Sequence, residues 1–101
     1  MPPLEKLQRL AGAGIELVPL VEFPRHYVFT RDGFAALVER AGDGFGAIGA
    51  PGLFTEKGVL AMLVWRNGAA WFVAKGWERP ATGEEISSLR RFAADLARAL
   101  G

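Results

Sequence analysis

Cysteine is absent from the sequence, and several other features that would assign the chain to a functional class are scarce. Without cysteine there is no disulfide framework, no thiolate nucleophile and no cysteine-ligated metal site. The 12 Lys and Arg residues are balanced by 11 Asp and Glu residues, which leaves a formal net charge of +1. Proteins that bind nucleic acid or anionic membranes usually carry a surplus of positive charge. We therefore expect neither nucleic acid nor a membrane as a partner.

Long apolar runs and side-chain amides are also missing. No apolar run approaches the roughly 20 residues that a membrane-spanning helix needs. Residues 1–10 mix acidic, basic and apolar side chains, unlike a secretory signal. The single Asn and the single Gln agree with a heat-adapted source, although GC-rich coding gives the same bias. From these absences we expect a cytoplasmic protein.

Apolar residues are plentiful, and they predict a folded domain. Half of the 101 residues are hydrophobic and fewer than a quarter are charged, a balance typical of compact proteins and unlike that of disordered ones. The length predicts one domain over residues 1–101. A chain of this size buries only roughly 60–70% of its extended surface on folding, so a partner subunit would add to a modest core.

Two segments combine helical periodicity with signals for a helix end. Residues 3–11 place apolar side chains three and four apart and are followed by Gly12, which suits a helix stop. Near the C-terminus, Thr82 and Glu85 match the capping box, and the apolar positions after them repeat at three and four up to the last residues. We therefore predict helices at both ends of the chain.

The segment after Asp32-Gly33 admits two interpretations. With Asp32 as an N-cap, residues 34–41 form a helix that Gly42 ends. With Asp32-Gly33 as a type I′ turn, residues 34–40 form a returning strand. The segment is rich in good helix formers and fits period 3.6 better than period 2. We therefore predict a helix.

The remaining segments predict strands. Residues 15–23 form a strand that Pro19 confines to an edge or breaks, because proline cannot donate to the ladder. Residues 25–31 form a second strand, and the glycine-rich residues 42–58 hold a loop-rich third. Residues 59–66 and 69–77 flank Asn67-Gly68, the strongest short-range signal for a hairpin. The element order is then α-β-β-α-β-β-β-α. It predicts an α+β fold with a single-layer antiparallel sheet of about five strands and helices packed on one face.

Both faces of this hairpin are predicted to be largely apolar. Its first face is wholly apolar and suits packing under the helices; it carries Val59, Ala61, Leu63, Trp65, Ala70, Phe72 and Ala74. A face that meets water should be polar, yet the second face is largely apolar as well. It must be covered by a helix of the same chain, a second subunit or a ligand, because exposed apolar patches rimmed by charge mark contact sites. The candidate interface consists of Leu60, Met62, Val64, Arg66, Trp71, Val73, Lys75 and Trp77.

Sequence motifs for cofactor binding, metal binding or catalysis are incomplete or absent in this chain. Gly44, Gly46 and Gly49 satisfy the G-x-G-x-x-G string of dinucleotide sites, but the preceding strand, the following helix and the later acidic residue are not predicted. His26 is the only histidine, and no metal-ligand spacing surrounds it. The adjacent Ser87 and Ser88 fall inside a helix rather than on a nucleophile elbow. We predict no catalytic residue, no metal site and no cofactor.

The sequence thus predicts a small, non-enzymatic cytoplasmic domain that binds another protein, or a second copy of itself as a homodimer, through the second face of the hairpin. The alternative is a small-molecule-binding or enzymatic domain. In it the loop of residues 42–52, with Gly44, Gly46 and Gly49, would close with Arg25 and His26 over a ligand. This alternative lacks a catalytic pair.

Overall fold

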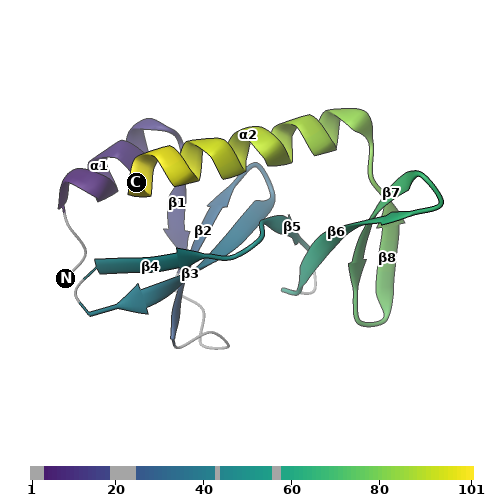
Figure 1. The fold of residues 1–101 in the computed structure, drawn as a ribbon, viewed down its shortest axis with the longest axis horizontal. Coiled ribbons are helices and arrows are strands. Elements are labelled where there is room, and N and C mark those ends of the chain that lie inside the picture. Colours follow the sequence, from purple (N-terminus) through teal and green to yellow (C-terminus); the bar gives the residue numbers. More distant parts are fainter. Residues whose placement is uncertain (1–3, 19–24, 43, 56–57) are drawn as a thin grey trace.

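The computed structural model describes residues 4–18, 25–42, 44–55 and 58–101. Within these residues the chain forms a helix at each end and a run of short strands between them (Figure 1). In chain order the elements are α1 (Leu4–Gly12), β1 (Glu16–Val18), β2 (His26–Arg31), β3 (Phe34–Ala41), β4 (Gly44–Ile48), β5 (Gly52–Phe54), β6 (Leu60–Arg66), β7 (Ala69–Ala74), β8 (Trp77–Pro80) and α2 (Gly83–Leu100).

Both predicted terminal helices are present, and α2 begins at the predicted capping box. The Glu85 backbone N–H donates to Thr82 Oγ1 over 3.1 Å, and the Thr82 backbone N–H donates to Glu85 Oε1 over 3.0 Å. These reciprocal bonds satisfy two backbone donors that the first turn of a helix otherwise leaves without partners. The helical periodicity and the cap therefore predicted the start of α2 correctly.

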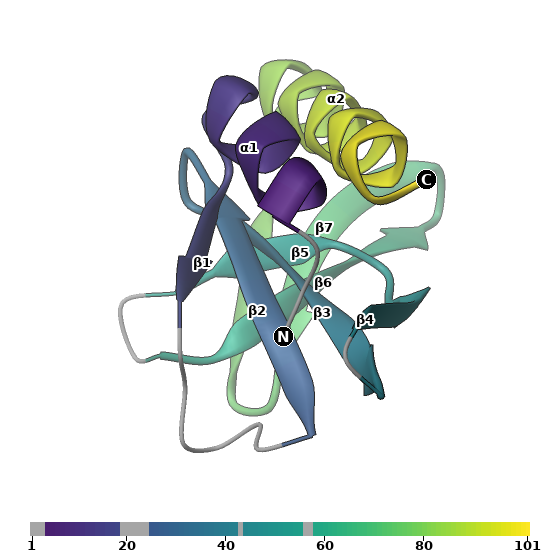
Figure 2. The same cartoon turned by 90° about the vertical axis from the view of Figure 1, so that its left-hand side faces the viewer.

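The strands pair antiparallel into one sheet that curls into a half-barrel beneath the helices (Figure 2). Along the sheet the order is β1-β2-β3-β5-β6-β7-β8, and β4 pairs with the second half of β3 outside this path. The edge position predicted for the strand beginning near Ile15 is confirmed, since β1 ends the sheet. Pro19, on which that prediction depended, lies outside the described residues.

The helix predicted for residues 34–41 is wrong, because this segment is β3. Asp32 and Gly33 have φ angles of 53° and 85°, the positive values that a type I′ turn requires at both central positions. β3 returns along β2 with Phe34 opposite Arg31. Its first three residues are all buried, so its apolar run does not alternate and imitates a helical stripe. Tertiary pairing outweighed local helix propensity here.

The predicted five-stranded sheet and the order α-β-β-α-β-β-β-α are therefore wrong, although the chain is α+β with antiparallel strands. Besides β3, two further strands were missed. The glycine-rich segment holds β4 and β5 instead of one strand. The strand predicted to run to Trp77 ends at Ala74; Gly76, with a φ of 72°, lies in a turn, and β8 follows it.

The predicted hairpin is confirmed in position and register. β6 and β7 flank Asn67 and Gly68, whose φ angles are 50° and 79°. Trp65 lies opposite Ala70, and Val64 lies opposite Trp71. An Asn-Gly pair adopts these angles at little cost, so it determines both the turn and the alignment of the strands.

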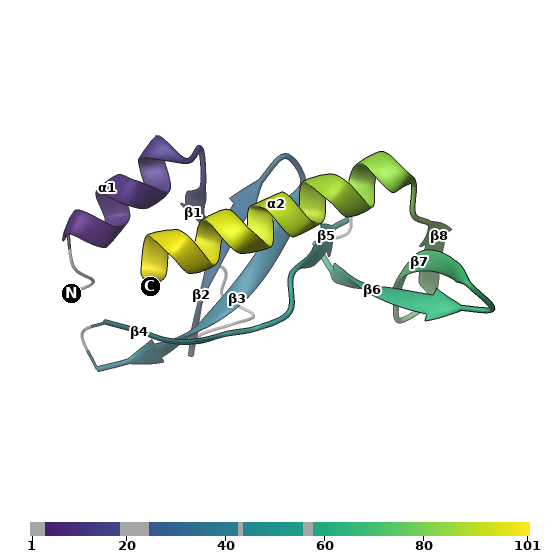
Figure 3. The same ribbon diagram turned by 45° about the horizontal axis from the view of Figure 1, so that its top comes forward.

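The hydrophobic core lies between the two helices and the first face of the sheet. Figures 2 and 3 show α1 and α2 on the same side of the strands, with α1 beside the C-terminal part of α2. Leu89, Phe92 and Leu96 of α2 pack with Phe29 of β2 and Phe72 of β7. Since successive residues of a strand point to opposite faces, this packing leaves the second face pointing away from both helices.

Candidate functional site

The apolar surface predicted on the hairpin exists as one patch on the second face of the sheet. Met62 lies opposite Val73, and Val64 lies opposite Trp71, so their side chains share this face with Leu60. All five are half-buried, and the described helices pack against the opposite face. The patch is therefore an apolar sheet surface that no described helix covers.

The predicted basic residues lie beside this patch. Arg66, at the end of β6, pairs with Glu78 of β8 over 2.9 Å between Nη1 and Oε2. Both side chains are about half exposed, 48% and 52%, and an ion pair so open to water stabilises a fold by less than about 1 kcal/mol. Lys75 is exposed in the turn between β7 and β8. Because Glu78 lies opposite Val73 on the same face, the Arg66–Glu78 pair crosses β7 beside Trp71, and Lys75 lies at the end of the hairpin.

Trp77 lies on the other face from the one predicted. It is the first residue of β8 and lies opposite Ala74, a residue of the first face. Its side chain packs against the hydrophobic core. The prediction assumed one continuous strand through residues 75 and 76. A turn there ends β7 and starts β8, so the alternation of faces does not carry across it.

The second face continues well beyond the hairpin. The register places Met62 opposite Gly52, Gly52 opposite Ala35, and Ala35 opposite Thr30, so one row of the same face crosses from β6 to β2. Phe54 lies opposite Leu60 and extends the apolar patch onto β5. This extension depends on β3 being a strand, so the sequence-based prediction of a helix there concealed it.

A cavity of about 260 Å³ opens in this extended part of the second face; we call it the hollow. Its lining residues come from three strands and a turn, and they are Val18, Val28, Thr30, Gly33 and Phe54. Among the described residues that line it, Thr30 carries the only polar side chain. No spacing pattern links residues so far apart in sequence, so the hollow could not have been found before the strands were paired.

The residues of the alternative ligand site gather at one end of the sheet. His26 begins β2 opposite Glu39, and β4 with its glycines pairs with the same end of β3. At Gly46 a Cβ atom would lie 3.2 Å from the Cβ of Glu39, closer than side chains normally approach. The Gly49 N–H donates to the Leu37 carbonyl over 2.7 Å. Together with Gly44, which begins β4, and Arg25, whose carbonyl accepts from the Arg40 N–H, these residues serve strand pairing. Close packing accounts for Gly46 and Gly49 without a ligand, whereas a Cβ at Gly44 would make only an ordinary contact, 3.7 Å from the Ala41 carbonyl oxygen.

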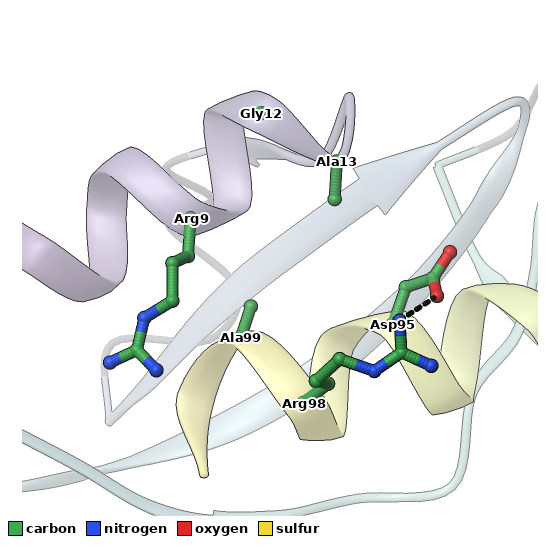
Figure 4. A pocket seen from close by; sticks show the side chains of 6 residues that line it. All are labelled: Arg9, Gly12, Ala13, Asp95, Arg98 and Ala99. Atoms are coloured by element: carbon green, nitrogen blue, oxygen red, sulfur yellow. Dashed lines mark ion pairs between the residues drawn. The ribbon is translucent and has the colours of Figure 1, made fainter.

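A second cavity, of about 400 Å³, lies between α1 and α2 (Figure 4). It is lined by Arg9, Gly12, Ala13, Asp95, Arg98 and Ala99. Arg9 and Arg98 lie in the last turns of their helices, where the helix dipole favours cations. Arg98 also pairs with Asp95, over 3.8 Å. Both arginines thus compensate the helix ends, and Arg98 also pairs with the one carboxylate among the described lining residues.

Asp95 is held at the edge of this groove by Arg31 of β2. Arg31 Nη1 donates to Asp95 Oδ2 over 2.8 Å and to the Ala13 carbonyl over 3.1 Å. This hydrogen bond, with the positive charges of Arg31, Arg98 and Arg91 adding to it, holds the pKa of Asp95 below its ordinary value against the opposing effect of burial. The carboxylate is thus ionised and bound in a structural ion pair.

Within the described part of the chain, no group of three or more His, Cys, Asp or Glu side chains is arranged to hold a metal ion. Across the same residues, no helix has both the length and the apolarity needed to cross a membrane. Comparisons with known protein families, with curated proteins and with solved structures found no match for this chain.

Proposed function

We propose that this protein is a small, non-enzymatic, cytoplasmic protein-interaction domain that self-associates as a homodimer through the second face of its sheet. The observation that carries the proposal is the apolar patch of that face, which comprises Leu60, Met62, Val64, Trp71 and Val73. Antiparallel sheets that meet water on one side normally place polar residues there. An apolar patch with a charged rim is instead typical of a protein contact.

The size of the contact is consistent with a dimer. Complete burial of one large apolar side chain contributes on the order of 2–3 kcal/mol, and a micromolar dimer requires about 8 kcal/mol. In a two-fold dimer every residue of the patch is buried twice, once in each copy. The net charge of +1 imposes little repulsion between two copies.

Light scattering with circular dichroism tests this proposal, using two tryptophans of the same hairpin. Trp71→Glu places a charge within the patch and should yield a folded monomer. Trp65→Glu is the matched control, because Trp65 is 57% exposed on the first face and lies outside the proposed contact. We expect the wild type and Trp65→Glu to be dimeric. A monomeric wild type refutes the proposal, and a Trp71→Glu variant that unfolds would place Trp71 within the core of its own chain.

A further inference from the structure

We infer that Asn67 is a site of spontaneous covalent modification, where the side-chain amide is lost as ammonia and aspartate or isoaspartate forms while the end of the β6–β7 hairpin is open. This site does not depend on the proposed homodimer. The fold contains two turns of the same conformation, and only one of them, the turn at Asn67, lies at a hairpin end that the described residues leave open to water.

The reaction needs only an asparagine, the peptide nitrogen that follows it, and water. The Gly68 nitrogen, having given its proton to hydroxide, attacks the side-chain carbonyl carbon of Asn67. A new carbon–nitrogen bond forms, the bond to the side-chain nitrogen breaks, and that nitrogen leaves as ammonia with a proton from water. Water then opens the succinimide ring at either carbonyl, which yields aspartate or isoaspartate. Asn67 is the only asparagine of the chain, and a glycine after it presents no Cβ to hinder the attack.

The closed turn does not allow this attack. Asn67 and Gly68 have φ angles of 50° and 79°, as a type I′ turn requires. The first central residue of such a turn has a ψ of about 30°, which places the following nitrogen nearly opposite Cβ across the Cα–C bond. The two reacting atoms are then held apart. The amide is therefore lost only when the turn opens, and the rate of its loss reports how often that happens.

The end of the β6–β7 hairpin has few contacts that keep it closed. Residues 66–69 are all exposed, and Trp65, the preceding residue of β6, is 57% exposed. A Cβ at Gly68 would meet no atom of the described residues within 4 Å. Arg66 is held by Glu78, but this ion pair is open to water and therefore weak. Figure 3 shows the hairpin end reaching beyond the rest of the fold. Segments with so few buried contacts open most readily.

The turn between β2 and β3 has the same backbone and is held closed. Arg31, which precedes it, binds Asp95 of α2 over 2.8 Å. Phe34, which follows it, is only 5% exposed. The Phe54 N–H also donates to the Gly33 carbonyl over 2.8 Å. Opening this turn would break these contacts, so it opens far less often than the hairpin end.

This second turn also shows how the hairpin tolerates the aspartate product. Asp32 and Gly33 have φ angles of 53° and 85°, close to those of Asn67 and Gly68, so an Asp-Gly pair adopts the same turn in this protein. Aspartate at position 67 therefore preserves the hairpin. Isoaspartate adds one carbon to the main chain, which a two-residue turn cannot accommodate, and so disrupts the register of β6 and β7.

The variant Asp32→Asn compares the two turns within one molecule, because each then reads Arg-Asn-Gly. Peptide mapping by mass spectrometry measures amide loss at each position during incubation at mildly alkaline pH, with circular dichroism confirming the fold. We expect position 67 to react at least about tenfold faster than position 32 in the folded variant, and both to react alike in urea. Equal rates in the folded variant overturn the inference. So does a folded wild type that keeps its Asn67 amide while the urea-unfolded wild type loses it.

Asn67→Asp is the control that matches the aspartate product. It should fold and melt near wild type. On ion exchange, aged wild type should gain an acidic form that elutes with Asn67→Asp, whereas the variant itself should gain none. The only other side-chain amide of the chain is that of Gln8. Acidic forms that accumulate equally in both proteins would place the amide loss at Gln8 and overturn the inference.

Discussion

Among individual residues, Arg31 joins more parts of the fold than its position at the end of β2 suggests. Its guanidinium binds Asp95 of α2 and the Ala13 carbonyl, which belongs to the connection between α1 and β1. It also lies 5.7 Å from the centre of the Phe92 ring. The side chain is only 18% exposed, so these contacts are shielded from water. One cation of the sheet thus binds both α2 and the connection that follows α1.

The ion pair between Arg31 and Asp95 predicts a dependence of stability on pH. The hydrogen bond from Arg31 lowers the pKa of Asp95 in the folded chain, so the unfolded chain binds this proton at higher pH than the folded one. The contribution of the pair is complete above the ordinary pKa of 3.8 and is lost as the pH falls through the lower folded value. Asp95→Asn should therefore lower the free energy of unfolding at pH 7, and its difference from wild type should shrink in acid.

Urea unfolding at neutral and acidic pH measures this difference. Glu39→Gln is the control, since it removes an exposed carboxylate near the end of β3. A difference between wild type and Asp95→Asn that is equal at both pH values would show that the ion pair does not stabilise the fold.

The N-cap residue Thr82 is the second single residue for which we predict an effect on stability. Burial works to raise the pKa of Glu85, but the hydrogen bond from the Thr82 backbone and those from Arg79 and the Thr82 side chain outweigh it and hold this pKa below its ordinary value. Thr82→Ala removes the side-chain acceptor and should lower stability by about 1 kcal/mol. For a domain of this size the melting temperature should fall by roughly 4–8 °C. Thr82→Ser keeps the hydroxyl and should melt near wild type; equal losses in both variants would contradict a capping role.

At the scale of elements, the turn between β2 and β3 determines the sheet. Gly33 has a φ of 85°, and the only atom of the described residues that a Cβ there would meet is Leu53 Cδ1, at 3.9 Å. Space is therefore available, and the cost of a side chain comes from the left-handed backbone, roughly 1–2 kcal/mol. We expect Gly33→Ala to lower the free energy of unfolding by about that amount.

Gly83→Ala is the matched control for this prediction. Gly83 begins α2, a Cβ there meets nothing within 4 Å, and alanine favours a helix. Chemical denaturation should show this variant to be as stable as wild type or more so. If Gly33→Ala were equally harmless, residues 34–41 would not depend on a type I′ turn.

For the molecule as a whole, the amino-acid composition and the small net charge predict no tight binding of zinc or nucleic acid. The chain has one histidine and no cysteine, and its net charge of +1 allows little release of counterions. We expect elemental analysis of untagged protein to find no stoichiometric zinc. We also expect no sub-micromolar affinity for DNA at about 150 mM salt. Either result to the contrary would refute the prediction.

Of the two parts of the candidate site, the sequence predicted the hairpin patch but not the hollow. The hairpin patch depends on Asn67-Gly68 and on the alternation of side chains beside it, so Val64 and Trp71 could be paired from their spacing alone. The hollow depends on Thr30 and Phe54, which β3 brings together from different parts of the chain. Trp77 was assigned to the wrong face because one turn went unseen.

The sequence by itself determined the elements whose signals are local: α1, the capped start of α2, and the β6–β7 hairpin with its register. Each depends on residues within a few positions of one another, so the same interactions operate before the rest of the chain has folded. For residues 34–41 the local signals conflicted, since Asp32-Gly33 suits a turn into a strand while the following residues favour a helix, and tertiary structure decided for the strand. Their local preference for a helix is worth a few tenths of a kcal/mol per residue, and pairing with β2, β4 and β5 while packing beneath α2 outweighs it.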